Sequence, residues 1–329
     1  MIEPTRDGDA AGRDIDVLVL GEINPDVIVR AVDPRPAFGQ VELLVDSIDL
    51  VIGSSSVIFA CGMARLGLRT AFVGVVGDDP MGRFMLDALR ARGIDVASCR
   101  VDPDVPTGAS VILTSGADRA ILTAPGTMPL LRDADVPEAL VRRARHLHVG
   151  SLYLLDALRP SLAARFAAAR SAGLTTSVDS NWDPRETWDG GIRDILRETD
   201  VFLPNEAEAR RIAGMADVVA AALALAAHGP RIVAVKLGMD GAIAAERDGT
   251  VTRVPSLAVD AIDTTGAGDS FDAGFLAGFL AGRPVRDCLA LGVAAGSLST
   301  LRVGGTAGQP TLPEAEAAAR AAGLLRARG

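Results

Sequence analysis

The stretch DTTGAGDSFDAGF, residues 263–275, places a single carboxylate between a glycine turn and an apolar run. From Asp269 onward, phenylalanines recur every four residues at Phe271, Phe275 and Phe279, which predicts a helix with one buried face. The backbone N–H groups of the Gly-Ala-Gly turn would lie at the positive end of that helix, where an anion is favoured. The stretch therefore predicts an anion-binding turn beside a carboxylate.

Two interpretations of Asp269 follow from these residues alone. Aspartate is favoured near helix starts and glycine in tight turns, so the pattern can serve structure only. Alternatively, the turn holds a phosphoryl group during its transfer, while Asp269 takes the proton from an attacking hydroxyl. Neighbouring motifs have to decide between the two.

The composition bounds the class of protein. The chain has 329 residues, a hydrophobic fraction of 49% and a mean hydropathy of +0.28, which excludes a disordered chain. Its formal charge of −9 argues against a nucleic-acid partner, because phosphate backbones select concentrated Lys and Arg. We therefore expect small molecules as partners.

Several other classes are disfavoured. No stretch approaches the roughly 18 to 20 uninterrupted apolar residues of a membrane span, and the first residues lack the pattern of a secretory signal. We therefore expect a cytoplasmic protein with no membrane partner. The three cysteines are scattered and predict neither a disulfide frame nor a thiolate metal site. The single lysine, Lys236, lies in RIVAVKLG, which is not a P-loop, so a P-loop NTPase is ruled out.

Short β-branched runs alternate with alanine-rich amphipathic stretches along most of the chain, the pattern of parallel strands joined by crossover helices. This predicts an α/β fold of three layers with a mostly parallel central sheet. We expect strands at 17–20, 71–75, 146–149, 175–178, 201–203 and 232–236. We expect helices at 55–66, 81–92, 160–172, 206–213, 218–228, 269–281, 285–301 and 313–325.

Two segments, about 26–52 and 107–125, break the alternation. The second contains GASVILTSGADRAILTA, which is typical of two strands around a turn. Because neither segment contains a crossover helix, we expect the two to pair outside the main sheet as a small β lid. The chain then divides into a flexible leader, residues 1–14, and one domain, residues 15–329, that carries the lid.

The sequence DTTGAGDSFDAGFLAGFL resembles the signature of the ribokinase-like, or PfkB-type, carbohydrate kinases, and the resemblance extends over about residues 16–313. It implies a ribokinase-like sandwich and an enzyme that uses ATP with Mg²⁺. It also implies that Asp269 is the general base and that Gly266, Ala267 and Gly268 form the anion hole.

The same resemblance implies a bound monovalent cation, K⁺, near Asp263 and Thr265, whose counterparts in many family members help to hold one. It also suggests substrate contacts from Asn24 and Asp26 in GEINPD, which is similar to the first-strand motif of the family. From the residues alone, Asn24 and Asp26 can equally well be turn formers.

The segment GSSSVIFACG resembles the first signature of the family, a glycine pair and an asparagine at the entry to a helix. We expect Gly53, Ser54 and Ser55 to contact the substrate. Ser54 replaces the second glycine and Ile58 replaces the asparagine. In VDSNWDPRETW, similar to a stretch of fructokinase-like and ketodeoxygluconate-kinase-like members, Asp183 occupies the position of an expected arginine.

LPNEAEA resembles the pair that orders Mg²⁺ and the nucleotide phosphates in this family, with Asn205 on the nucleotide side and Glu208 near the metal, partly through water. Residues three apart at a helix start share a face, so the spacing suits that role. The alternative is a capping box, in which Asn205 caps the helix and Glu208 bonds back to it.

VKLGMDGA resembles the strand and loop that lead to the adenine pocket, which implies nucleotide contacts from Lys236, Gly238 and Gly241, joined by Gly268. The two loop glycines would permit close approach of the nucleotide, although a plain β-turn explains them equally well.

Together the motifs predict an ATP-dependent kinase that phosphorylates a hydroxymethyl group of a sugar or sugar acid of the ribose, fructose or ketodeoxygluconate type. Two alternatives stay open: a nucleoside kinase of the same family and a non-catalytic sugar sensor on the same fold. A dinucleotide oxidoreductase is disfavoured, because no G-x-G-x-x-G follows the first strand. We also expect a homodimer, because an exposed lid strand can pair with a second lid.

Overall fold

The structure, a computed structural model, describes residues 12–32, 35–36, 38–115 and 118–325. Of the predicted leader, residues 1–14, only residues 12–14 belong to this part of the chain. The boundary of the leader therefore stays a prediction. No helix among the described residues has the length and apolar character needed to cross a membrane.

The central sheet has eight strands in the order β14-β13-β12-β11-β10-β9-β1-β4. Neighbouring strands run parallel from β4 to β12, and β13 and β14 extend the sheet as antiparallel strands. This confirms the mostly parallel sheet. The strands are β1 (Ile15–Leu20), β4 (Thr70–Val73), β9 (Ala144–Val149), β10 (Thr175–Val178), β11 (Val201–Phe202), β12 (Ile232–Lys236), β13 (Ala242–Glu246) and β14 (Val251–Val254).

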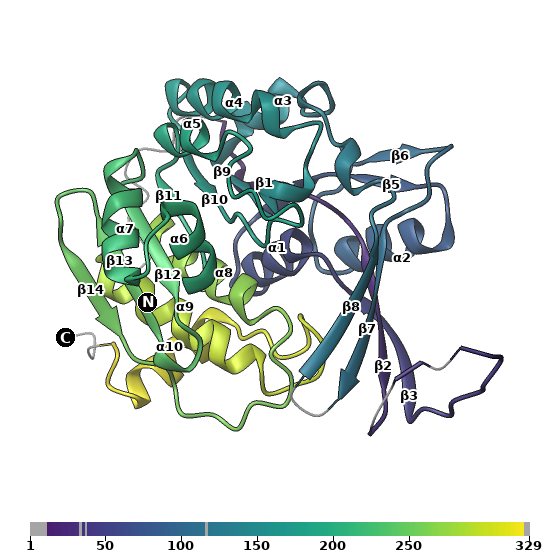
Figure 1. Ribbon diagram of the computed structural model, residues 1–329. Coiled ribbons are helices and arrows are strands. Elements are labelled where there is room, and N and C mark those ends of the chain that lie inside the picture. Colours follow the sequence, from purple (N-terminus) through teal and green to yellow (C-terminus); the bar gives the residue numbers. More distant parts are fainter. Residues whose placement is uncertain (1–11, 33–34, 37, 116–117, 326–329) are drawn as a thin grey trace.

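Helices cover both faces of this sheet (Figure 1), which confirms the three layers. Strand β1 shows why both faces are buried: Val17 and Val19 join one hydrophobic cluster, and Leu18 and Leu20 join the other. The first cluster includes α1 (Ser55–Arg65), α2 (Pro80–Arg90), α8 (Ala267–Leu280), α9 (Val285–Ser299) and α10 (Leu312–Ala321). The second includes α3 (Glu138–Arg143), α4 (Arg159–Ser171), α5 (Ile192–Arg197), α6 (Glu206–Ala213) and α7 (Val218–Ala227).

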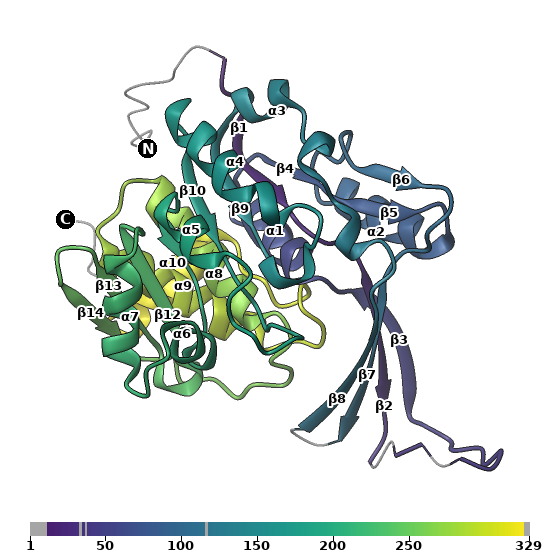
Figure 2. The same cartoon turned by 45° about the horizontal axis from the view of Figure 1, so that its top comes forward.

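A second sheet of four strands, in the order β3-β2-β7-β8, projects from one side of the molecule (Figure 2). Strands β2 and β7, which lie far apart in the sequence, pair in parallel, and β3 and β8 flank them as antiparallel strands. The two segments without crossover helices therefore lie in one sheet. The strands are β2 (Pro25–Arg30), β3 (Ser47–Ile52), β7 (Ala109–Ser115) and β8 (Asp118–Ala124).

Some predicted boundaries are wrong. The strand expected at 71–75 is interrupted at Gly74, where a Cβ would meet the Gly21 carbonyl oxygen at 2.7 Å. Beyond Gly74 the chain forms β5 (Val75–Gly77), which pairs with β6 (Arg100–Asp102) instead of continuing in the central sheet. The last helix ends at Ala321 rather than at residue 325, because Gly323 adopts a left-handed φ of 71°.

Candidate active site

Two cavities meet at the turn that precedes α8, close to the carboxyl ends of the parallel strands, where open α/β sheets bind their ligands. The smaller cavity, of about 270 Å³, is lined by Thr265, Gly266 and Asp269 from this turn. The larger, of about 540 Å³, is lined by Ala267 and Gly268. One short segment therefore separates the two cavities.

The turn has the geometry of an anion site at a helix start. Gly266 adopts a left-handed φ of 71°, and a Cβ there would meet Ile58 Cγ2 and the Gly305 Cα at 2.8 Å. The Ala267 N–H already donates to the Thr264 carbonyl at 3.3 Å. Among the described residues, the N–H groups of Gly266 and Gly268 donate to no acceptor, so they are available to a ligand.

Asp269 lies at the border of the two cavities with only 9% of its surface exposed. Burial raises the pKa of Asp269 to about 8; the negative charge of Asp179 adds to the rise, and the ammonium of Lys236 opposes it. A carboxyl with this pKa can exchange a proton near neutral pH.

Lys236, the last residue of β12, lies between two buried carboxyls. Its Nζ is 3.0 Å from Asp179 Oδ2 and 3.0 Å from Asp272 Oδ2. Burial opposes the charge of Lys236, but Asp179 and Asp272 outweigh burial and raise its pKa. Burial also raises the pKa of Asp272, while the ammonium of Lys236 overcomes the effect of burial on Asp179 and lowers its pKa. The ammonium of Lys236 therefore bridges the two carboxyls, since its Nζ lies within hydrogen-bonding distance of both.

Both residues singled out in GEINPD line the smaller cavity, and both are buried. The side-chain amide of Asn24 donates to Asp26 Oδ1 at 3.4 Å. A Cβ at Gly53 would lie 2.3 Å from the same Asp26 oxygen, so the glycine lets α1 begin against this carboxylate. Asn24, Asp26 and Gly53 are thus brought together, while Gly53 does not itself line the cavity.

Glu22 is a buried carboxyl in the wall of the smaller cavity. It accepts hydrogen bonds from the hydroxyls of Ser54 at 3.0 Å, Ser56 at 2.5 Å and Ser151 at 2.9 Å. Burial raises the pKa of Glu22, and the hydrogen bonds from Ser56 and Ser151 oppose that rise. These bonds tie the loop after β1 to the start of α1.

Ser54 caps α1 in a left-handed conformation, with φ at 67°, that favours glycine. Its hydroxyl accepts from the Val57 N–H at 3.0 Å and lies 2.7 Å from the Glu22 carbonyl oxygen. Ser55 lines the cavity, and its hydroxyl accepts from the side-chain amide of Asn181 at 2.6 Å. These bonds hold a serine at a position where the family motif has a glycine.

Asn205 and Glu208 form the capping box that was the alternative to their ligand role. Each side chain accepts from the other residue's N–H, at 3.0 Å to Asn205 Oδ1 and 2.9 Å to Glu208 Oε2. Asn205 also pairs with Lys236 through an isolated parallel β-bridge. Burial and the charge of Asp179 raise the pKa of Glu208 to about 7, with Lys236 opposing. The pair therefore lies beside the carboxyl cluster without lining either cavity.

The remaining nucleotide candidates line the larger cavity together: Lys236, Gly238, Gly241 and Gly268. Gly241 has a φ of 87°, and a Cβ there would lie 2.1 Å from the Val254 carbonyl oxygen. A side chain at this position would thus force the loop away from β14.

The two cation candidates hold the turn in place. Asp263 Oδ1 accepts from the Thr265 N–H at 2.9 Å, and Oδ2 accepts from the Gly304 N–H at 2.9 Å. The carboxylate therefore links the segment before α8 to the loop after α9.

The two departures from the family motifs have structural explanations. Ile58 packs against Gly266 and Gly305 with 3% of its surface exposed, and it also lines the smaller cavity, so it forms an apolar part of the wall beside the turn. Asp183 is buried and accepts from the N–H groups of Arg185, Thr187 and Trp188 at 2.8 to 2.9 Å. Asp183 organises its own loop and does not reach the cavities.

Several residues of the site were not predicted from the sequence, among them five polar ones. Glu22, Ser151 and Asn181 line the smaller cavity, and Asp179 and Asp272 hold Lys236. Asp272 follows Asp269 by three residues and so shares its helix face, a spacing that could have identified it.

A family model described as pfkB family carbohydrate kinase matches residues 14–312. Fructokinase-2 of Oryza sativa subsp. japonica is 30% identical over 78% of this chain and 81% of its own length. Fructokinase of Klebsiella pneumoniae is 37% identical over 70% of this chain and 77% of its own. The 2-dehydro-3-deoxygluconokinase of Bacillus subtilis is 31% identical over 77% of this chain and 81% of its own.

Solved structures agree on the fold. A putative ribokinase from Agrobacterium tumefaciens matches with a TM-score of 0.83 and 25% identity over 95% of this chain and 99% of that one. Adenosine kinase from Sinorhizobium meliloti matches with a TM-score of 0.80 and 26% identity over 93% and 99%. A putative ribokinase II from E. coli, in complex with ATP and Mg²⁺, matches with a TM-score of 0.80 and 24% identity over 93% and 99%. The chain therefore belongs to the pfkB family of carbohydrate kinases.

Proposed function

We propose that this kinase transfers the γ-phosphoryl group of ATP to a hydroxymethyl group of a sugar or sugar acid. The observation that carries the proposal is the single turn that separates two cavities, with Asp269 and free N–H groups at the border. A donor on one side and an acceptor on the other would then meet where charge can be stabilised and a proton accepted.

In this mechanism Asp269 takes the proton of the acceptor hydroxyl, the oxygen of that hydroxyl bonds to the γ-phosphorus, and ADP leaves. The pKa of about 8 places Asp269 near the range in which a general base is effective. The N–H groups of Gly266 and Gly268 would face the charge on the phosphoryl oxygens.

The larger cavity suits ATP. Its wall includes the apolar side chains of Leu257, Val259 and Phe271, against which a base can lie, while Lys236 and Gly268 lie at the end nearest Asp269. The triphosphate would extend toward that end, where Lys236 and the helix start both favour an anion.

Mg²⁺ would lie beside the carboxyl cluster and depend on water and the ATP phosphates, because no group of three or more His, Cys, Asp or Glu side chains among the described residues is arranged to hold a metal ion by itself. The buried carboxyls of Asp179, Asp269, Asp272 and Glu208 outnumber the single ammonium of Lys236, and a bound cation would favour their ionised forms. Mg²⁺ commonly keeps several waters and binds one or two carboxylates with substrate phosphates, so Glu208 would hold it through water. When bound, the metal would neutralise negative charge on the phosphates.

The smaller cavity favours a sugar over a nucleoside. Its volume of about 270 Å³ is small for a ligand site. Its described wall combines hydroxyl, amide and carboxylate groups with apolar side chains, but it contains no aromatic ring on which a base could stack. Asn24 and Asp26 would bind acceptor hydroxyls.

Ser110 of β7 and Thr123 of β8 also line the smaller cavity. We therefore infer that the four-stranded sheet acts as a lid that limits the entry of water.

The kinase proposal is tested by ADP release with Mg²⁺-ATP across ribose, fructose, 2-keto-3-deoxygluconate, other sugars and adenosine. One acceptor should drive turnover, and Asp269→Asn should lower that turnover at least about 10²-fold without loss of folding. Asp78→Asn, at an exposed position away from both cavities, is the matched control and should keep full activity. Full turnover in Asp269→Asn would refute the base assignment, and a sugar that binds without any turnover would establish the sensor.

Lys236 offers a direct test of the nucleotide site. Because it is the only lysine, isotope labelling of lysine gives a single side-chain NMR signal. Mg²⁺-ATP should shift this signal, whereas the sugar alone should leave it nearly unchanged. A signal that does not change with Mg²⁺-ATP would mean that the nucleotide binds elsewhere.

The K⁺ proposal for Asp263 and Thr265 predicts higher turnover in potassium buffer than in sodium buffer. Equal turnover in the two buffers would refute it.

A further inference from the structure

A third cavity, of about 710 Å³, lies at the amino ends of the parallel strands, far along the sheet from Asp269. Its wall is built from the chain at the starts of β1, β9, β10 and β12, the end of α8 and the beginning of α9. It shares no lining residue with the two cavities of the candidate active site. Its volume falls within the range of sites for small molecules.

The third cavity is rich in positive charge, although the chain as a whole carries −9. Two carboxylates, Glu246 and Asp248, line it together with five arginines: Arg13, Arg145, Arg231, Arg247 and Arg283. The local balance is therefore five positive groups against two negative ones. Such a hollow attracts anions.

Only part of this charge is neutralised by neighbours. Arg283 pairs with Glu316, and Arg145 lies 3.3 Å from Asp16 Oδ1. Asp16 is shared, because its Oδ1 also binds Arg69 at 2.9 Å. Arg145 therefore shares a single carboxylate with Arg69, so its charge is only partly compensated.

The other arginines have no carboxylate partner in the described part of the chain. Arg13 donates to the carbonyl oxygens of Ala172 and Gly173, which leaves its charge uncompensated. For Arg231 and Arg247, no side-chain hydrogen bond or ion pair exists among the described residues, and Arg231 instead lies over the Phe279 ring at 5.9 Å. An incoming anion would therefore not have to displace an existing partner of Arg231.

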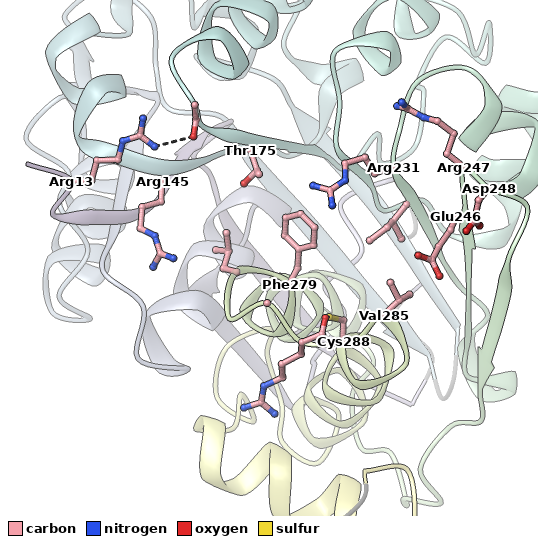
Figure 3. Close-up of a pocket in the computed structure, with 15 residues that line it drawn as sticks. Arg13, Arg145, Thr175, Arg231, Glu246, Arg247, Asp248, Phe279, Val285 and Cys288 are labelled. Atoms are coloured by element: carbon pink, nitrogen blue, oxygen red, sulfur yellow. Dashed lines mark hydrogen bonds between the residues drawn. The ribbon is translucent and has the colours of Figure 1, made fainter. Parts of the chain in front are cut away.

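The floor of the third cavity is apolar. Figure 3 shows Thr175 and Arg231 beside the ring of Phe279, which is half-buried, and Arg145 farther away, beyond Thr175. Ile232 and Val285 extend the apolar wall. A ligand that fits this surface has an anionic group for the guanidinium groups and an apolar or aromatic part for the ring. The planar fork of arginine matches phosphate oxygens in particular.

We propose that the third cavity binds a small phosphate-bearing molecule, with the phosphate held by the arginines that line the cavity, Arg145 and Arg231 among them, and an apolar or aromatic part on Phe279. The site is separate from the kinase centre, and its occupation does not depend on turnover. A nucleic acid is a poorer fit, because the chain as a whole carries a formal charge of −9.

The test is a calorimetric titration of the full chain with orthophosphate and with phenyl phosphate. Phenyl phosphate should bind at one site and more tightly than orthophosphate, because it also covers the Phe279 ring. Arg145→Gln combined with Arg231→Gln should weaken its binding at least about tenfold. The matched control combines Arg142→Gln and Arg253→Gln, two exposed arginines that do not line the cavity, and should bind like the native chain.

Two further variants locate the site. Arg231→Lys keeps the charge but loses the fork, so its affinity should be intermediate even if the double variant folds poorly. Gly268→Ala alters the active-site turn and should leave phenyl phosphate binding unchanged. No saturable binding below about 10 mM, unchanged binding in the Arg145 and Arg231 double variant, or loss of binding in Gly268→Ala would each overturn the proposal. Equal affinity for the two probes would overturn the contact with Phe279.

Discussion

Gly266 and Gly268 lie on either side of Ala267, and they lack a side chain for different physical reasons. Gly266 needs its left-handed φ of 71°, and a Cβ there would clash with Ile58 and Gly305 at 2.8 Å. At Gly268 a Cβ would meet only the Lys236 side chain, at 3.6 Å or more, which is ordinary contact. The first glycine therefore serves the fold, whereas the second leaves room for a ligand.

Alanine at the two positions should separate stability from activity. Gly266→Ala should destabilise the protein by roughly 2 kcal/mol or more, from backbone strain and the clash. Gly268→Ala should keep or slightly raise stability, since alanine favours a helix, yet lower turnover at least about tenfold because its methyl enters the phosphate space. Thermal melts and ADP release measure both effects. Full activity in Gly268→Ala would show that no phosphate approaches this N–H group.

Asp269 should make stability depend on pH. Its pKa of about 8 in the folded protein exceeds the usual value of 3.8, so the folded state retains a proton that the unfolded state loses. This contribution to stability is fully present below about pH 4 and is lost as pH rises through about 8. The side chain in Asp269→Asn cannot ionise, so this variant does not lose that contribution at high pH. We therefore expect Asp269→Asn to raise Tm, and to raise it more at pH 8.5 than at pH 6.

Activity should follow the opposite trend. The native enzyme should gain kcat/KM between about pH 7 and 8 as Asp269 loses its proton, while its Tm falls. Asp78→Asn, at an exposed position, should shift Tm equally at both pH values. A Tm difference for Asp269→Asn that is the same at both pH values would mean that Asp269 is ionised throughout.

At the scale of elements, a line of hydrogen bonds joins β9 and β10 inside the core. Thr175 Oγ1 bonds His146 Nδ1 at 2.7 Å, and Ser177 Oγ lies 2.6 Å from His146 Nε2 and 2.8 Å from His148 Nδ1. Burial lowers the pKa of both histidines to about 3, so both are neutral at pH 7. They serve the packing of the sheet rather than proton transfer.

Ser177 is the shared partner in this line, so its loss should be costly. Ser177→Ala leaves one nitrogen of His146 and one of His148 without a partner in the core, at about 1 to 3 kcal/mol each. Urea unfolding should show a loss of roughly 2 kcal/mol or more. Ser171→Ala, at an exposed hydroxyl on α4, is the matched control and should change little. Equal stability of both variants would mean that water replaces the serine.

Elements with a clear periodicity could be predicted from the sequence, and others could not. β10, β12 and α6 match their predicted bounds because β-branched runs or an amphipathic face end at turn residues. β13 was missed because its residues, Ala242–Glu246, are mostly alanine, which has little strand preference. The short α3 and α5 have only six residues each, too few for a helical period to be recognised.

The site was predictable where a motif carries the chemistry and unpredictable where side chains meet across the fold. Asp269 and its turn follow from one stretch of sequence. The pairing of Lys236 with Asp179 and Asp272 depends on three separate elements, and no local spacing encodes it. The capping box of Asn205 and Glu208 was one of the two alternatives that the sequence allowed, and the structure shows it, while their ligand role stays a prediction.

At the scale of the whole molecule, the four-stranded sheet has two chemically different faces. Asp26, Ser110 and Thr123 lie in one register across β2, β7 and β8 and line the smaller cavity. On the other face the register aligns Leu50, Val27, Val111 and Leu122 across all four strands. Leu50 and Leu122 are 47% and 63% exposed, so an apolar row crosses the face of the four-stranded sheet that points away from the smaller cavity.

We expect a second copy of the chain to cover this apolar row, because exposed apolar rows on sheets with open edges favour association. Light scattering after size-exclusion chromatography should give twice the 34.0 kDa of the chain. Leu50→Lys combined with Leu122→Lys should give the monomer mass, since two charges would have to be buried in the interface. Val251→Lys, on the edge strand β14 of the central sheet, is the control and should stay dimeric.

If two copies associate through this apolar row, we expect the association to affect binding of the sugar. The inner face of the same strands lines the smaller cavity, so a lid held by its partner would keep Ser110 and Thr123 in place around the acceptor. The lysine double variant should therefore raise KM for the sugar more than it lowers kcat at saturation. A native chain that is already a monomer at micromolar concentration would refute the dimer. A monomeric variant with unchanged KM would show that each lid closes over its own acceptor without help.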